Sequence, residues 1–256
     1  MAVTRTLLVA ALVAASATPL FAQGPGLPED TLVNTKVFPH DTPVREVVSA
    51  MRGFTAALGV RCDYCHVERQ GGPAGPGGRA ELNFPSDDKR TKVTARLMML
   101  MVRRINDSVL SRIPERPANA VAVTCMTCHR GVARPEPLAD IVTEAVGAGG
   151  LDSAARAYRA LRQRYYGRAS YDFGEGTLIA AAQGFLQQRR PDDALGLLAL
   201  DAEFFPSSAG VAGQMAEAYL AKGDTANAVA KLRQALQFDP SDRFARMRLR
   251  TLGVTD

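Results

Sequence analysis

The chain has 256 residues, a formal net charge of +5 at pH 7 and no tryptophan. Its basic residues are spread along the sequence with no Lys/Arg run longer than two, whereas nucleic-acid-binding proteins gather such charge on patches with interleaved aromatic residues, so we expect no nucleic-acid partner. Strand-type alternation is scarce and the helix-favouring residues Ala, Leu and Arg are abundant, which predicts an all-α protein with room for more than one domain.

Residues 1–22 have the features of a signal peptide. Arg5 supplies a short basic region, the apolar run at 7–17 is too short to span a bilayer, and small Ala22 suits the last position before cleavage. A membrane anchor is the alternative. We expect an exported, periplasmic protein, peripherally membrane-associated if it docks to a membrane complex. The mature chain has no stretch approaching about 18 uncharged apolar residues, so no transmembrane segment is expected.

A Gly/Pro-rich leader at 23–35 precedes the first predicted helix. Thr42-Pro43 is typical of a helix start, with Thr42 as N-cap and Pro43 in the first helical position, and Gly59 is typical of a helix end. Met51 lies on the apolar stripe of this helix, 15 residues before His66. A helix could therefore carry Met51 to the far side of a group that His66 binds.

Two Cys-x-x-Cys-His motifs contain all four cysteines and two of the three histidines: Cys62, Cys65 and His66, then Cys125, Cys128 and His129. Zinc ribbons place their cysteine pairs about 15–20 residues apart and need no such histidine, and a thiol-redox motif would accompany a βαβ pattern. Disulfides across two-residue loops would stabilise a domain poorly. The motif predicts covalent haem c, with thioether bonds to the cysteines and the adjacent histidine as proximal iron ligand.

Between the motifs, a turn-rich loop at 71–79 precedes a helix predicted to begin near residues 86–88. Met98 and Met101 share a face of this helix, and Met99 points about 100° away. Methionines most often fill cores, so ligation is one of two interpretations. His40, the remaining histidine, is an alternative sixth ligand.

The remainder of the chain, 143–256, changes character. Helical-hairpin signals recur with a period of 34 residues, and 216–240 resembles a tetratricopeptide (TPR) repeat, with 192–206 a weaker copy and 154–167 a degenerate earlier helix. The alternative is an ordinary helical bundle. Because about three repeats are needed to bury a continuous core, we expect this region to pack on the first domain or on a partner.

The order of motifs over residues 36–134 resembles the cytochrome subunit of photosynthetic reaction centres and its smaller dihaem relatives. The shared set is a Met-bearing helix, Cys-x-x-Cys-His, Asp-Asp-Lys, Ala-Arg-x-Met and Cys-x-x-Cys-His-Arg-Gly. The resemblance implies Met51 as sixth ligand of the haem on His66, and Met98, with Met101 as fallback, for the haem on His129. The reaction-centre subunit has four haems, a further distal histidine where Arg112 stands here, and no counterpart of the repeat tail.

These observations predict a dihaem cytochrome c domain at 36–142 followed by a TPR-like domain at 143–256. We expect an electron carrier, not an enzyme, that exchanges electrons with redox proteins such as a membrane respiratory or photosynthetic complex, the tail serving for docking. The alternative is a peroxidase-like haem enzyme with one open iron site.

Overall fold

A computed structural model describes residues 32–71, 78 and 80–254 of the chain. The predicted signal peptide, most of the leader and most of the loop at 71–79 lie outside the described residues. Within them the protein is built from nine α-helices, with one two-stranded ribbon and a few short turns of 3₁₀ or π geometry, so the all-α prediction is confirmed. Of the helices described, none is long and apolar enough to cross a membrane.

Helix α1, Val44–Leu58, ends as predicted at Gly59, whose φ of 65° is left-handed. Its predicted start was wrong by one residue. Pro43 has an extended backbone (ψ 136°) and occupies the cap position itself, so Thr42 lies outside the helix and provides no cap. The chain then makes a 3₁₀ turn, Cys62–Tyr64, and the antiparallel ribbon of β1, Val67–Glu68, and β2, Leu82–Asn83.

Helix α2, Arg90–Arg104, begins shortly after the predicted start and continues through a π turn, Ile105–Val109, and a 3₁₀ turn, Leu110–Arg112. Asn106 joins the end of α2 to the segment before the second motif. Its side-chain amide donates to the Val123 carbonyl (2.8 Å) and its oxygen accepts from the Val123 amide (2.9 Å). The second motif forms the one-turn helix α3, Cys125–His129.

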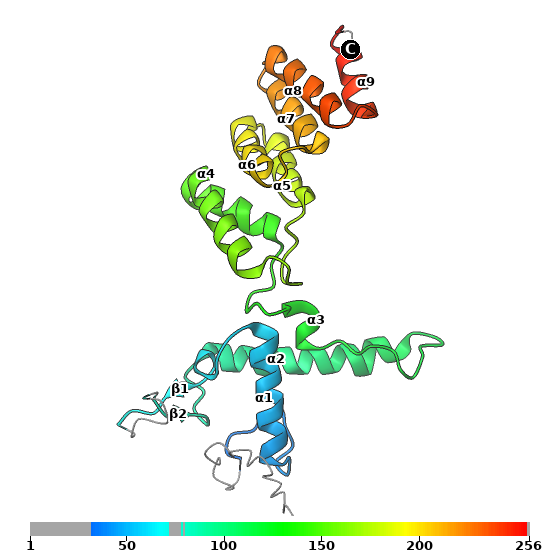
Figure 1. Cartoon of the computed structure of the whole chain (residues 1–256). Helices are drawn as coiled ribbons and strands as arrows, with labels where there is room; N and C mark the ends of the chain where they lie inside the picture. Colours follow the sequence, from blue (N-terminus) through cyan, green and yellow to red (C-terminus); the bar gives the residue numbers. More distant parts are fainter. Residues whose placement is uncertain (1–31, 72–77, 79, 255–256) are drawn as a thin grey trace, which may run out of the picture.

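The remaining helices form successive hairpins: α4, Leu138–Tyr165; α5, Glu175–Gln187; α6, Pro191–Phe204; α7, Ala209–Ala221; α8, Thr225–Phe238; and α9, Arg243–Thr251. The first residues of α5 and α7 are 34 positions apart, as are those of α6 and α8, which matches the period in the sequence. Figure 1 shows these hairpins stacked one after another, with α3 between them and the part that holds α1 and α2.

Helix α4 runs through the predicted domain boundary between residues 142 and 143, and its backbone is kinked at Gly149 and Gly150. The division into 36–142 and 143–256 stays a prediction. The predicted helix at 154–167 corresponds to the second half of α4.

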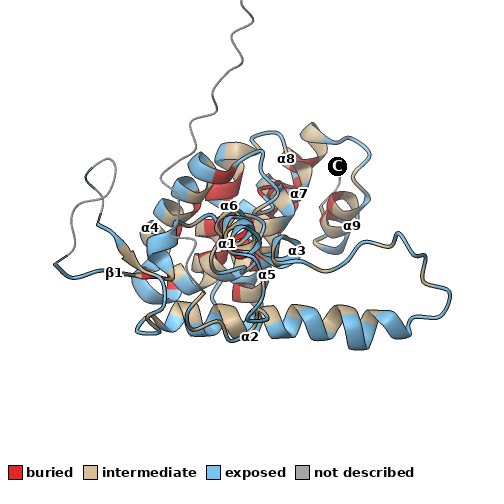
Figure 2. Ribbon diagram, turned by 90° about the horizontal axis from the view of Figure 1, so that it is seen from below, coloured by how far each residue is buried: buried red, intermediate tan, exposed pale blue. Residues whose placement is uncertain are grey.

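The described residues form two hydrophobic cores: one mainly over α4, α5 and α6, with Val132 and the α7 residues Val211 and Ala218, and one over α7, α8 and α9. The N-terminal part has hardly any core. Among its described residues before Val132, only Val47, Ala57 and His66 are buried. In Figure 2, α2 is tan and pale blue along its length, which agrees with the absence of buried residues in that helix.

Candidate cofactor sites

The first motif folds as a tight turn. The amide of His66 donates to the carbonyl of Cys62 (3.0 Å), and so does the amide of Cys65 (3.2 Å). Cys62 is exposed and Cys65 is half-buried, so at least one thiol of the pair is open to a ligand. Burial raises the pKa of the Cys65 thiol.

His66 is enclosed by protein, with 8% of its surface exposed. The Phe84 ring meets it edge-on, with ring centroids 4.9 Å apart. Burial, followed by the positive charge of Lys92, lowers the pKa of His66, which favours the neutral imidazole that binds metals. Its Nδ1 atom is buried and has no hydrogen-bond partner among the described residues.

Residues at the N-terminal end of α2 donate hydrogen bonds to this motif. The Thr91 hydroxyl donates to the Tyr64 carbonyl (2.6 Å), and the Lys89 ammonium donates to the Asp63 carbonyl. These side chains replace the hydrogen bonds that the carbonyls of a short turn would otherwise lack. The start of α2 and the Cys-x-x-Cys-His turn are thereby held together.

A second support, which we call the Lys92 network, consists of Lys92, Asp87 and Arg96. Lys92 donates to the carbonyls of Phe84 (2.7 Å) and Ser86 (2.7 Å) and pairs with Asp87 (3.1 Å). Arg96 pairs with the other oxygen of Asp87 (2.8 Å), and chiefly this hydrogen bond keeps the pKa of the Asp87 carboxyl far below its usual range. Only 12% of the Lys92 side chain and 17% of the Arg96 side chain are exposed. The network fixes the loop that carries Phe84 over His66.

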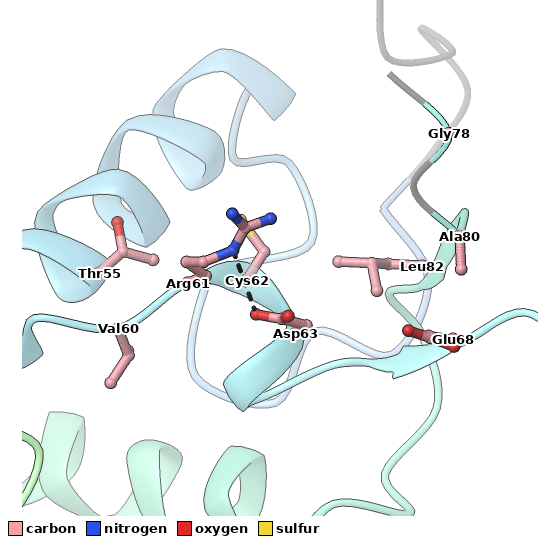
Figure 3. A pocket seen from close by; sticks show the side chains of 9 residues that line it. All are labelled: Thr55, Val60, Arg61, Cys62, Asp63, Glu68, Gly78, Ala80 and Leu82. Atoms are coloured by element: carbon pink, nitrogen blue, oxygen red, sulfur yellow. Dashed lines mark ion pairs between the residues drawn. The ribbon is translucent and has the colours of Figure 1, made fainter. Parts of the chain in front are cut away.

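An open hollow of about 640 Å³ lies beside the first motif, within the range of about 300–1,000 Å³ typical of ligand pockets. Figure 3 shows Cys62 in its wall, next to the Arg61–Asp63 ion pair (3.8 Å). The lining residues come from α1, the motif, the ribbon and the segments that lead into the motif and into β2: Thr55, Val60, Arg61, Cys62, Asp63, Glu68, Gly78, Ala80 and Leu82. A large ligand that binds Cys62 therefore has space beside it.

The second motif is held by hydrogen bonds that its own side chains make. Thr124 caps α3 and exchanges hydrogen bonds with Thr127, three residues on. His129 Nδ1 lies 2.9 Å from the Val132 carbonyl oxygen. Because a carbonyl only accepts, Nδ1 must carry the proton, and Nε2 keeps its lone pair for a metal. This is the arrangement expected of a histidine that ligates through Nε2.

The thiols of this motif match those of the first. Cys125 is half-buried and Cys128 is exposed, and burial raises the pKa of the Cys125 thiol. None of the four cysteines forms a disulfide, and within the described ranges no three His, Cys, Asp or Glu side chains gather as a metal cluster. Each motif instead presents two thiols and one imidazole, the donor set that covalent haem c requires.

The two motifs meet through glycines. The Gly131 amide, two residues after His129, donates to the Ala57 carbonyl near the end of α1 (2.8 Å). Gly59 lies so close to Gly131 that a Cβ atom at Gly59 would stand 2.0 Å from the Gly131 carbonyl oxygen. Contact between the two segments therefore depends on the missing side chain at Gly59.

Comparison with known proteins finds a matching family over the part of the chain that holds both motifs. The family model described as "Photosynthetic reaction centre cytochrome C subunit" matches residues 47–155. This segment is reaction-centre-cytochrome-like. It contains both motifs, α1 from its fourth residue onward and the whole of α2.

Three curated relatives are similar to part of this chain. The "Photosynthetic reaction center cytochrome c subunit" of Thermochromatium tepidum is 36% identical over 93 residues, and that of Rubrivivax gelatinosus is 31% identical over 107. These alignments cover 36% and 41% of this chain, and 19% and 24% of the relatives. "Cytochrome c-554" of Chloroflexus aurantiacus is 35% identical over 75 residues, 29% of this chain and 14% of the relative. The chain thus spans roughly a fifth of the length of these relatives.

The reaction-centre-cytochrome-like segment exposes much of its apolar surface. Met51 is half-buried on α1, whereas Met98 and Met101 on α2 are 40% and 45% exposed. Leu97 and Leu100 are 63% and 47% exposed. Exposed apolar residues gathered on one helix are typical of a surface that binds a ligand or another protein. The assignments of Met51, Met98 and Met101 as ligands stay predictions.

His40, the alternative ligand, is exposed, with its Nδ1 3.3 Å from the Thr35 hydroxyl. Sequence reasoning missed several residues that shape the sites: Phe84, Lys92, Thr91 and Val132. Phe84, Lys92 and Thr91 contact the first motif or the loop beside it, and the Val132 carbonyl contacts His129. No sequence motif marks these four residues. Gly59 was recognised as a helix end, but its contact with Gly131 was not foreseen.

Proposed function

We propose that this protein is an exported dihaem c-type cytochrome that carries electrons between redox proteins. The observation that supports this most is the pair of Cys-x-x-Cys-His turns inside a reaction-centre-cytochrome-like segment. Two such turns within one matched segment have no simpler chemical use than haem attachment.

In this proposal each motif holds one haem c. Cys62 and Cys65 form thioethers to the first and His66 is its proximal ligand; Cys125, Cys128 and His129 do the same for the second. The distal ligands are Met51 and Met98, with Met101 as fallback for the second. When bound, such groups supply reversible one-electron chemistry at iron, and His/Met ligation favours a mid- to high-potential carrier over an oxygen-activating enzyme.

The packing of the N-terminal part supports the proposal. Among the described residues of this part only three are buried, which is too few to hold it together, since burial of apolar surface is the main favourable term in folding. Two haems would cover the uncovered side chains of α2 and supply the missing apolar contacts. The C-terminal part, which has its own cores, needs no such help.

The partners belong to the proposal as well. We propose periplasmic redox proteins, including a membrane-bound respiratory or photosynthetic complex, as donor and acceptor, and the stacked hairpins as a TPR-like docking part. The signal peptide at 1–22 would direct the chain to the compartment where haem c is attached. A net charge of +5 favours encounter with an acidic partner.

The test is the optical spectrum of protein matured in a periplasm that contains haem-attachment machinery. Two covalent haems per chain, low-spin spectra and no response to carbon monoxide are expected. Absence of covalent haem would refute the proposal. A high-spin ferric signal or rapid carbon monoxide binding would favour the peroxidase-like alternative instead.

The distal ligands are tested one at a time. Met51→Ala and Met98→Ala should each open one haem to carbon monoxide, whereas Met99→Ala, on the same helix as Met98 but on another face, should open neither. If Met98→Ala leaves both haems closed and Met101→Ala opens one, the fallback ligand is the correct one.

A further inference from the structure

Val132 belongs to two parts of the molecule at once. Its carbonyl accepts the hydrogen bond from His129 Nδ1 (2.9 Å), and its amide donates to the carbonyl of the same His129 (2.9 Å). Val132 is 6% exposed and belongs to the hydrophobic core formed mainly by α4, α5 and α6. The carbonyl that orients His129 is therefore anchored in the core of the hairpin part, the name we use for helices α4 to α9.

A second contact from that part reaches the neighbouring residues. Ser170, in the connection between α4 and α5, donates its hydroxyl proton to the Arg130 carbonyl (2.6 Å). Arg130 and Gly131 both have positive φ angles, 49° and 88°, so the chain turns sharply between His129 and Val132. Ser170 and the buried Val132 side chain hold this turn at its two ends.

His66 has no comparable anchor. Its Nδ1 has no hydrogen-bond partner among the described residues, and its surroundings are the Phe84 ring and the Lys92 network, all within the N-terminal part. The two histidines are thus held by different parts of the chain. A change in the core of the hairpin part therefore acts on His129 through Val132. It does not act on the His66 ring through a hydrogen bond, because the described residues provide none to its Nδ1.

We propose that the hairpin part is a positioning element for one cofactor site: through Val132 its core sets the orientation and Nδ1 hydrogen bond of His129. The inference rests on the proposed function, in which His129 ligates the second haem. A hydrogen bond from Nδ1 fixes the tautomer and ring orientation of a ligating histidine and raises its basicity. A partner that alters packing in α4–α6 would thereby tune one haem and leave the other unchanged.

The test compares two buried valines in the full-length haem-loaded protein. Val132→Ala keeps the carbonyl but removes its anchor in the core. Val146→Ala removes the same two methyl groups from the same core, where Val146 is 4% exposed on α4. The readouts are the electron paramagnetic resonance spectrum of the ferric protein and the midpoint potential of each haem. The double variant Cys62→Ala/Cys65→Ala, which keeps only the second haem, assigns the signals.

Val132→Ala is expected to shift the second haem's resonance signal and raise its potential, because a looser hydrogen bond makes the imidazole a weaker donor. The first haem should not change, and Val146→Ala should lower thermal stability without moving either signal. Equal spectra and potentials for the two variants would overturn the inference. If Val132→Ala does not fold, Ser170→Ala, which removes only the Arg130 contact, must show the same direction of change for the inference to hold.

Failure of the proposed function has a different signature. In that case the unmodified protein lacks two covalent haems, which overturns the proposal and the inference together. Two haems with a second signal that does not respond to Val132 overturn the inference alone.

Discussion

Replacing Gly59 by alanine should separate the two motif segments. Gly59 ends α1 in a left-handed conformation (φ 65°), and a Cβ atom there would stand 2.0 Å from the carbonyl oxygen of Gly131 and 2.9 Å from its carbonyl carbon. Both obstacles are backbone atoms, so no side-chain rotation relieves the clash. The Gly131 backbone must move away from α1, which breaks its hydrogen bond to Ala57 (2.8 Å).

The cost follows from these two losses. A left-handed conformation costs a residue with a Cβ atom roughly 1–2 kcal/mol. Loss of a backbone hydrogen bond adds about 1 kcal/mol. Together they lower the free energy of unfolding by about 2–3 kcal/mol, which corresponds to a fall in melting temperature of roughly 4–12 °C for a chain of this size.

Thermal unfolding of the haem-loaded protein, followed by circular dichroism and by haem absorbance, measures this effect. Gly53→Ala is the matched control, because Gly53 is an exposed residue inside α1 and a Cβ atom added there would meet no other atom within 4 Å. That change should raise stability by about 0.5–1 kcal/mol, since alanine favours the helix. A Gly59→Ala variant as stable as the unmodified protein would show that the close approach to Gly131 is wrong.

Two further predictions concern buried charges. Asp201 on α6 is fully buried and has no hydrogen-bond partner among the described residues; burial, with the charge of Glu175, raises its pKa to about 7. The folded state then binds the proton more tightly than the unfolded state, so the free energy of unfolding falls as pH rises from about 4 to 7. Asp201→Asn removes this penalty. In denaturant unfolding it should raise the free energy of unfolding by up to about 4 kcal/mol at pH 8 and by little at pH 4. Lys92→Met should cost about 2 kcal/mol and speed amide hydrogen exchange in residues 84–88, whereas Lys222→Met, which removes an exposed ion pair with Asp192, should leave that exchange unchanged.

Local signals predicted much of the fold. Gly59 ends α1 because glycine accepts a left-handed φ at little cost, and the period of 34 recurs in the first residues of α5 and α7. Helix starts were placed less well: Pro43 occupies the cap position, although a Thr-Pro pair favours a helix beginning one residue earlier. The all-α class could be predicted from the composition and from the scarcity of the alternating apolar and polar residues that strands show.

Long-range contacts were not predictable in the same way. The motif identified the chemistry of His129, but nothing in the sequence around Val132 indicates that its side chain joins a core formed mainly after residue 137. Asp201 has the spacing of a helix residue between apolar neighbours, and its complete burial depends on how α4, α5 and α6 meet. Likewise, the apolar side chains of α2 could be interpreted as ordinary core until the structure left them uncovered.

The uneven distribution of cores has a consequence for biosynthesis. Hairpins with their own apolar interiors can fold as soon as they are synthesised, whereas the segment before Val132, of whose described residues three are buried, gains little by closing on itself. In a haem c protein, that segment would stay accessible to the attachment enzymes and become compact only after both thioether pairs had formed. A chain that lacks one haem would then have a folded C-terminal part and an unfolded N-terminal part. Proteases would cut the unfolded part and so remove the incomplete protein.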